Sequence, residues 1–280
     1  MRRRAAVLGS PIDHSLSPKL HRAAYRELDL DWEYQRVECT SDELPAFIDS
    51  LDDTWMGLSL TMPLKETVLE IVSSSDALAS VVHSANTVYR HEAQQGAPWR
   101  VANTDVTGIV RALAVAGVTG LARATVLGSG ATARSAVAAL SALGAREIRI
   151  HARRVEAARS VAQLAQTFGI SSTVASLEPI RIDSDILIST LPGSTAAPWA
   201  LVEARSDTAL FDVSYHPWPS ALAEGWRSSR PKAMVVSGRE MLMWQAVSQV
   251  GLMTGLFDGE DLDGPSASAV AGALAAAMPH

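Results

Sequence analysis

Short apolar runs alternate along the first part of the chain with longer segments that are apolar on one face only. The short runs have the length of strands, and the longer segments have the period of helices. This mixture predicts an open αβ layer domain, with Ser17 and Ser41 as helix caps. Strands are expected at 5–8, 32–37, 57–60, 86–89 and 100–102, and helices at 18–28, 42–51, 65–72 and 106–116.

From residue 122 the alternation of apolar runs and amphipathic segments becomes more regular. Such alternation is typical of a doubly wound parallel sheet. A final apolar helical region follows Gly238, and we expect it to return to the first domain. The small-residue segment 266–279 predicts a packing helix or a loose tail. In the regular part, strands are expected near 124–128, 147–151, 173–175, 185–190, 208–213 and 233–236, and helices at 131–143 and 155–168.

A glycine-rich turn lies between the first strand and the first helix of this second half. Gly128 can form the tight turn, Gly130 lets a phosphate approach the backbone, and Ala133 is small enough for close helix packing. Such a turn places a dinucleotide pyrophosphate at a helix N-terminus, although an ordinary turn can share the pattern. The expected cofactor contacts here are Gly128, Ser129, Gly130, Ala131, Thr132 and Ala133.

The end of the next strand indicates which dinucleotide is bound. No Asp or Glu occurs there before Glu156, whereas Arg153 and Arg154 follow directly, and Arg134 lies on the first turn of the glycine-loop helix. Guanidinium groups suit a ribose 2′-phosphate, and an acid suits the free 2′-hydroxyl. The pattern favours NADP over NAD. The alternative is that these arginines are solvated charges, but a helix N-terminus disfavours cations.

The composition excludes several classes of partner. The formal net charge of −6 argues against nucleic acid as the main partner, because a phosphate backbone requires a basic surface. The single cysteine, Cys39, forms no internal disulfide and fits a reducing cytoplasm, where we expect it to be a buried filler. The apolar run after the three N-terminal arginines is too short for a signal peptide, and no run is long enough to span a membrane.

Polar side chains follow several of the strands expected in the first domain. Because ligands of open αβ sheets bind at the carboxyl ends of strands, we expect these side chains to share one site. They supply hydroxyls, an amide, an ammonium and a carboxylate, a set that suits a small polyhydroxylated acid and implies no metal. These residues are Ser15, Ser17, Thr61, Lys65, Asn86 and Asp105.

In the four segments that hold these residues and in three others, the chain resembles the shikimate dehydrogenase family over nearly its full length. The motifs are GSPIDHSLSP (9–18), SLTMPLKE (59–66), ANT (85–87), NTD (103–105), the glycine loop (128–133), FDVSYHP (211–217) and GREMLMWQA (238–246). The resemblance implies a substrate-binding domain made of residues 1–105 and 238–280. It also implies a Rossmann-like NADP-binding domain at 106–237.

The resemblance further implies a role for each matching residue. Ser15 and Ser17 hold the substrate carboxylate, and Thr61, Asn86 and Asp105 bind ring hydroxyls. Lys65 is the catalytic acid/base, paired with Asp105. Gln245 and Tyr215 contact the substrate, and Leu191, Val213 and Gly238 lie along the cofactor. The chain departs from the family pattern at Ser59, Ala102, Val106, Ala152 and the segment 189–192.

The activity implied is the reversible NADPH-dependent reduction of 3-dehydroshikimate to shikimate, a step in aromatic amino acid biosynthesis. The protein is expected in the cytoplasm as a monomer or homodimer, with no nucleic acid or membrane partner. Two alternatives are an NAD-preferring quinate/shikimate dehydrogenase and a non-catalytic NADP-binding regulator. Each site residue also has a structural interpretation; Asp105, for example, can cap the helix that starts at Val106.

Overall fold

The structure is a computed structural model that describes residues 2–90, 97–259 and 262–279. The chain forms two compact units, Met1–Gly108 with Met243–His280, and Ile109–Leu242. Two helices, α5 (Thr104–Val115) and α9 (Gly238–Thr254), begin in one unit and end in the other. The sequence places the boundaries at 106 and 238, close to where these helices begin.

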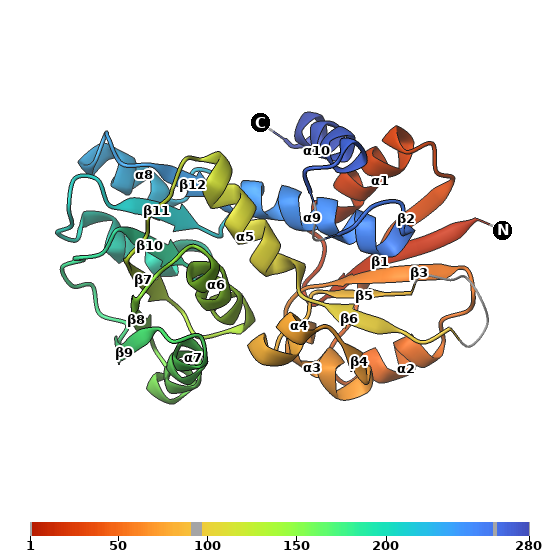
Figure 1. Cartoon of the computed structure of the whole chain (residues 1–280), viewed down its shortest axis with the longest axis horizontal. Coiled ribbons are helices and arrows are strands. Elements are labelled where there is room, and N and C mark those ends of the chain that lie inside the picture. The colour runs from red at the N-terminus through yellow and green to blue at the C-terminus, as the bar shows by residue number, and fades with distance from the viewer. Residues whose placement is uncertain (1, 91–96, 260–261, 280) are drawn as a thin grey trace. The chain divides into compact units, whose positions relative to one another are not determined.

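The first unit contains a mixed sheet with the strand order β2-β1-β3-β5-β6-β4 (Figure 1). Strand β1 is parallel to β2 and β3, and β5 is antiparallel to both β3 and β6. The carboxyl ends of β1, β3 and β6 and the amino end of β5 therefore lie at one edge. The strands are β1 (Arg3–Gly9), β2 (Trp32–Glu38), β3 (Trp55–Leu60), β4 (Ser74–Ser75), β5 (Thr87–Tyr89) and β6 (Arg100–Ala102).

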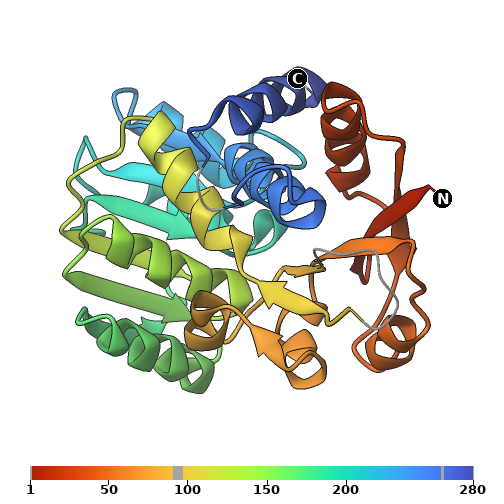
Figure 2. The same ribbon diagram turned by 45° about the vertical axis from the view of Figure 1, so that its right-hand side comes forward.

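Both faces of this sheet are covered, because β3 is buried at every position. One core cluster joins Leu8 and Leu58 to Leu64 and Val68 of α3, and another joins Tyr25 of α1 to Met253 of α9. The C-terminal helix α10 packs against α1 (Figures 1 and 2), as expected for a packing helix. The helices are α1 (Ser17–Glu27), α2 (Leu44–Asp49), α3 (Leu64–Ile71), α4 (Ala77–Val82) and α10 (Pro265–Ala277).

The second unit contains a parallel sheet with the order β12-β11-β10-β7-β8-β9. Chain order reverses between β7 and β10, and such a switch point is where doubly wound sheets bind nucleotides. The predicted fold class is confirmed. The elements are β7 (Arg123–Leu127), α6 (Ala131–Ala142), β8 (Glu147–Ala152), α7 (Val155–Thr167), β9 (Ser171–Ser176), β10 (Ile186–Ser189), η1 (Gly193–Leu201), β11 (Ala209–Asp212), α8 (Ala221–Ser229) and β12 (Val235–Ser237).

Two expected helix caps, Ser17 and Ser41, are wrong, and the alternative role of Asp105 as a cap is not observed. Ser17 lies inside α1, where Leu16 occupies the capping position. Helix α2 begins later than expected, after Glu43, so Ser41 does not cap it. The side chain of Asn103 accepts a hydrogen bond from the Val106 amide at 3.2 Å and caps α5 in place of Asp105.

Four elements, β4, α4, η1 and α8, have no counterpart among the ranges expected from the sequence. Asp76 caps α4 by accepting from the amide of Ala79. The sequence also predicts a polar loop, HEAQQGAP (91–98), between the strands expected at 86–89 and 100–102, and most of it lies outside the described residues. Cys39 is buried, and burial raises the pKa of its thiol. Over the described part of the chain, no helix is both long and apolar enough to cross a bilayer, and no three His, Cys, Asp or Glu side chains form a metal-binding group.

Candidate active site

An ion pair joins the first turns of two helices in the first unit. The Nζ of Lys65 on α3 lies 2.5 Å from Oδ2 of Asp105 on α5. The Lys65 side chain is 14% exposed and the Asp105 side chain 4%. Charge-assisted hydrogen bonds of this length are strong. Exposed ion pairs contribute little to stability, but this pair is mostly buried. The pair is therefore held in fixed geometry while its cation stays accessible.

Asn86 orients the carboxylate of this pair. Its Nδ2 donates to Asp105 Oδ1 at 2.8 Å and to Gln245 Oε1 at 3.0 Å. Its Oδ1 accepts from the amide of Thr104 at 2.8 Å and from the hydroxyls of Thr104 and Thr87, each at 3.0 Å. Because both ends of this buried amide are fully engaged, its orientation is fixed.

Backbone pairing brings these side chains together. The amide of Ala85 donates to the carbonyl of Lys65 at 2.8 Å, which ties the first turn of α3 to the segment before β5. The backbone N–H of Asn86 donates to the carbonyl of Ala102 at the end of β6. The backbone carbonyl of Asn86 accepts from the N–H of Leu60 at the end of β3. Because Asn103 caps α5, the Asp105 carboxylate remains available to Lys65 and Asn86. Lys65, Asn86, Asp105 and Gln245 form one cluster, which we call the Lys65 cluster.

Behind the Lys65 cluster lies a buried network that the sequence analysis missed. Gln249 donates through Nε2 to the Asn86 carbonyl and the Thr87 hydroxyl, at 3.0 and 3.1 Å. Its Oε1 accepts from Ser59 at 2.7 Å and lies 3.2 Å from Nε2 of His21. Gln249 follows Gln245 by one helical turn and therefore shares its face of α9. That spacing is the signal that identifies it.

The burial of His21 makes the stability of the first unit sensitive to acid. Burial lowers the pKa of His21 to about 3. Between that value and the ordinary pKa of His, the imidazole is protonated in the unfolded chain but neutral in the folded chain. The free energy of unfolding is therefore unaffected by His21 above the ordinary pKa of His, about 6.5, and it decreases as the pH falls below that value. Between about pH 7.5 and 4.5 the loss is expected to be about 3 kcal/mol.

Denaturant unfolding of the wild type and of His21→Gln at these two pH values measures this effect. The wild type is expected to lose about 3 kcal/mol more than the variant over this interval. Equal losses in the two proteins would show that His21 contributes nothing to acid sensitivity.

The structure places three further residues expected at the substrate, Ser15, Ser17 and Thr61, around the same edge of the sheet. Ser15 and Ser17 follow β1, and Thr61 follows the parallel neighbour β3. The Ser15 hydroxyl accepts from the Ser17 amide at 3.3 Å. A Cβ on Gly9 would lie 2.3 Å from Cγ2 of Thr61, so only glycine fits between these two strand ends.

In the second unit, the glycine loop has the geometry that the sequence predicts. Gly128 has a φ of +114°, and a Cβ there would lie 2.2 Å from the hydroxyl of Thr190, at the end of the neighbouring strand β10. Around Gly130, the N-cap of α6, a Cβ would meet no atom within 4 Å. No side chain caps α6. The loop therefore leaves room for a phosphate at the uncapped N-terminus of α6.

Three arginines lie on α6 and at the carboxyl end of β8, as expected. Arg153 and Arg154 are exposed and, over the described residues, make no ion pair. Arg134 on α6 donates to the hydroxyl of Ser160 on α7 at 3.3 Å. These residues fit a 2′-phosphate, because Arg153 and Arg154 have no competing carboxylate partner in the part of the chain that the structure describes.

The other residues expected at the cofactor also lie in the second unit. A Cβ on Gly128 would lie 3.6 Å from Cδ2 of Leu191. A Cβ on Gly238 would lie 1.9 Å from the carbonyl oxygen of Val213, so this close approach requires glycine. The Tyr215 carbonyl accepts from Arg239 at 3.3 Å, and burial raises the pKa of the Tyr215 phenol. Tyr215 lies outside the unit that holds the Lys65 cluster.

The Lys65 cluster combines a proton donor, a carboxylate acceptor and two amides, a set suited to binding hydroxyl groups and transferring a proton. Residues 7–88 match the family model described as the shikimate dehydrogenase substrate binding domain. The shikimate dehydrogenase (NADP(+)) of Methanothermobacter thermautotrophicus is 31% identical over 261 residues, which cover 89% of this chain and 90% of that protein.

Solved structures give the same result. The crystal structure of Mycobacterium tuberculosis shikimate dehydrogenase has a TM-score of 0.82 and 37% identity, and the match covers 98% of this chain and 99% of that chain. The Thermus thermophilus enzyme in complex with NADP(H) and shikimate has a TM-score of 0.78 and 26% identity, over 99% and 100% of the two chains. On this evidence, the chain belongs to the shikimate dehydrogenase family.

Proposed function

We propose that this protein interconverts 3-dehydroshikimate and shikimate with NADP as cofactor, in the biosynthesis of aromatic amino acids. The observation that carries the proposal is the ion pair of Lys65 and Asp105, held by Asn86 and Gln245 at one sheet edge. Relatives that cover most of the chain are NADP-dependent shikimate dehydrogenases. We place the protein in the cytoplasm, in keeping with its single cysteine, as a monomer or homodimer.

The substrate residues follow from the chemistry of a hydroxylated acid. We assign the substrate carboxylate to the hydroxyls of Ser15 and Ser17, and the ring hydroxyls to Thr61, Asn86 and Asp105. Both Nδ2 hydrogens of Asn86 are already engaged, one of them by Gln245. A ring hydroxyl that binds Asn86 therefore displaces or shares the contact with Gln245. Tyr215 is assigned to the substrate from the second unit.

Lys65 handles the proton in this proposal. The bound NADP cofactor supplies the hydride in one direction and accepts it in the other. During reduction, the Lys65 ammonium donates a proton to the carbonyl oxygen as negative charge develops there. During oxidation, the neutral amine takes the proton back. Asp105 directs Nζ, because its carboxylate accepts from Lys65 on one oxygen and from Asn86 on the other.

The second unit fits the cofactor. The dinucleotide pyrophosphate is assigned to the turn of Gly128, Ser129 and Gly130 and to the first turn of α6 (Ala131, Thr132 and Ala133). Arg153 and Arg154, with Arg134, are assigned to the 2′-phosphate. Leu191, Val213 and Gly238 are assigned to the remainder of the cofactor.

The absorbance of NADPH at about 340 nm, followed with purified protein, NADP+ and either shikimate or quinate, tests this proposal. We expect turnover with shikimate and a much lower kcat/KM with quinate. Faster turnover of quinate would assign the protein to the quinate class. Binding of NADPH without turnover of either acid would make it a regulator.

A further inference from the structure

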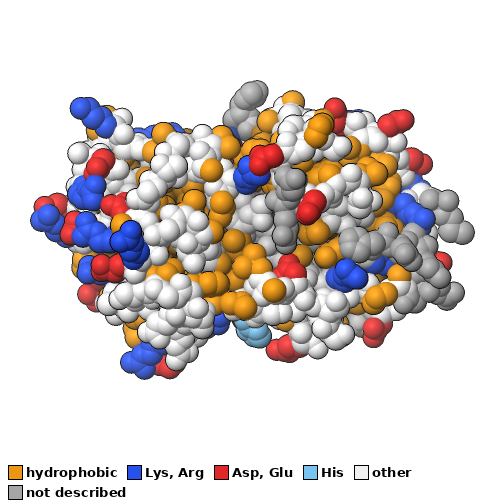
Figure 3. Space-filling model, in the orientation of Figure 1, with side chains coloured by type: hydrophobic (Ala, Val, Ile, Leu, Met, Phe, Trp, Pro, Cys, Tyr) orange, Lys and Arg blue, Asp and Glu red, His pale blue; other side chains and the backbone are white. Residues whose placement is uncertain are grey.

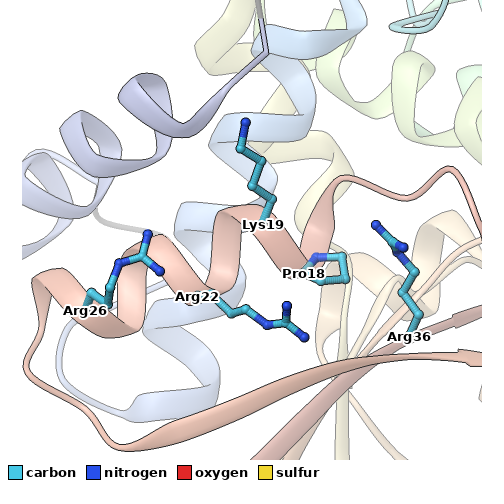
Figure 4. A pocket seen from close by; sticks show the side chains of 5 residues that line it. All are labelled: Pro18, Lys19, Arg22, Arg26 and Arg36. Carbon is cyan, nitrogen blue, oxygen red and sulfur yellow. The ribbon is translucent and has the colours of Figure 1, made fainter.

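A cavity of about 350 Å³ lies between α1 and β2 in the first unit (Figure 4). Four of the five residues that line it are cationic, and none is acidic. The lining residues are Pro18, Lys19, Arg22, Arg26 and Arg36. In a protein of formal net charge −6, a cavity lined by four cations is a local reversal of charge.

Over the described residues, Lys19, Arg22, Arg26 and Arg36 form no ion pair with a carboxylate. Glu38, on β2, is engaged by the Ser10 hydroxyl at 2.6 Å and the Ile12 amide at 3.2 Å. Repulsion among like charges favours the binding of an anion between them.

Two of the guanidinium groups are fixed before any ligand binds. Arg22 donates through Nε and Nη2 to the Tyr34 carbonyl, at 3.1 and 2.8 Å. Arg36 donates in the same way to the Ser15 carbonyl, also at 3.1 and 2.8 Å. Both guanidinium groups point into the space between α1 and β2 (Figure 4). Each keeps its Nη1 hydrogens for another acceptor, at a reduced cost in side-chain entropy.

The dimensions of the cavity select the class of anion. Lys19 and Arg26 are separated by two turns of α1, about 10 Å along the helix axis. Two or three linked phosphates match the length of this row, and they bring more negative charge to the four cations than a single phosphate does. A nucleic acid requires a longer basic surface, and on the face drawn in Figure 3 basic side chains alternate with acidic ones.

We propose that the cavity of Lys19, Arg22, Arg26 and Arg36 binds a small molecule that carries two or more linked phosphate groups. None of these residues belongs to the Lys65 cluster or to the cofactor residues of the second unit. The site is therefore additional to the proposed function. Arg22 and Arg36 clamp the ligand, and Lys19 and Arg26 neutralise its outer charge.

Calorimetric titration with inorganic pyrophosphate tests this site, with saturating adenosine 2′-monophosphate, which has no linked phosphates, present to occupy the cofactor arginines. We expect saturable binding, at least about tenfold tighter than that of inorganic phosphate. The double variant Lys19→Gln/Arg26→Gln is expected to bind pyrophosphate at least about tenfold more weakly. Lys19→Arg/Arg26→Lys, which keeps both charges, is expected to retain most of the affinity.

The matched control is Lys232→Gln/Arg146→Gln, which removes the same charge from two exposed positions outside the cavity. It is expected to bind pyrophosphate as the wild type does. Three results would each overturn the proposal: no saturable binding to the wild type, equal weakening in the two Gln variants, or binding of a single-stranded oligonucleotide in place of pyrophosphate.

Discussion

Replacing Lys65 with alanine is expected to lower kcat for shikimate oxidation by about 10³-fold, with a change in KM of less than about tenfold. The reason is that general acid–base catalysis contributes about 10² to 10⁴ in rate, whereas most of the assigned substrate contacts remain. The variant leaves the buried Asp105 carboxylate without its cation, which can destabilise the fold. Circular dichroism therefore checks that the variant is folded. Steady-state kinetics with varied shikimate measure both parameters.

The chain offers a matched control, because it has only two other lysines, Lys19 and Lys232. Lys232 is exposed and lies in the second unit. Lys232→Ala is expected to leave kcat and KM unchanged. If Lys65→Ala kept a kcat close to that of the wild type, Lys65 would not be the proton-transfer group.

Removing the two arginines after β8 is expected to change cofactor preference. In Arg153→Gln/Arg154→Gln, kcat/KM for NADPH should fall by about 10²-fold, because each charged hydrogen bond to the 2′-phosphate contributes to binding. The value for NADH should change by less than about threefold, because NADH lacks that phosphate. The ratio of the two values, measured with 3-dehydroshikimate, is the readout.

Arg146→Gln/Arg149→Gln is the control for this prediction, because it removes two exposed arginines just before and within the same strand. It is expected to keep the preference for NADPH. An equal loss with both cofactors in Arg153→Gln/Arg154→Gln would mean that these arginines do not recognise the 2′-phosphate.

The sequence predicted best where one periodic pattern decided the structure. The regular apolar strands of the second half predicted a doubly wound sheet, and β7 to β12 occupy nearly the expected ranges. The Gly128 turn was equally predictable, because a positive φ beside Thr190 excludes other residues. Polar residues after β3 and β6 also predicted that Lys65 and Asp105 lie together, since the ends of parallel strands meet at one edge. Asn86 reaches this edge from the amino end of the antiparallel strand β5, and Gln245 was expected only from the family resemblance.

The roles of individual residues were harder to predict where two neighbouring side chains can make the same contact. Asn103 and Asp105 are both good helix caps, and only the fold shows that Asn103 takes this role. Ser59 departs from the family pattern, and its hydroxyl donates to Oε1 of Gln249 on α9. That contact joins residues far apart in the chain, and local patterns carry no information about it.

The central claim is that this protein moves a hydride directly between the C3 position of shikimate and NADP. Oxidation of shikimate labelled with deuterium at C3, with NADP+ as the acceptor, tests this claim most directly. The account predicts that mass spectrometry finds one deuterium in the nicotinamide ring of the NADPH formed. Deuterium found only in the solvent, or no NADPH at all, would contradict it.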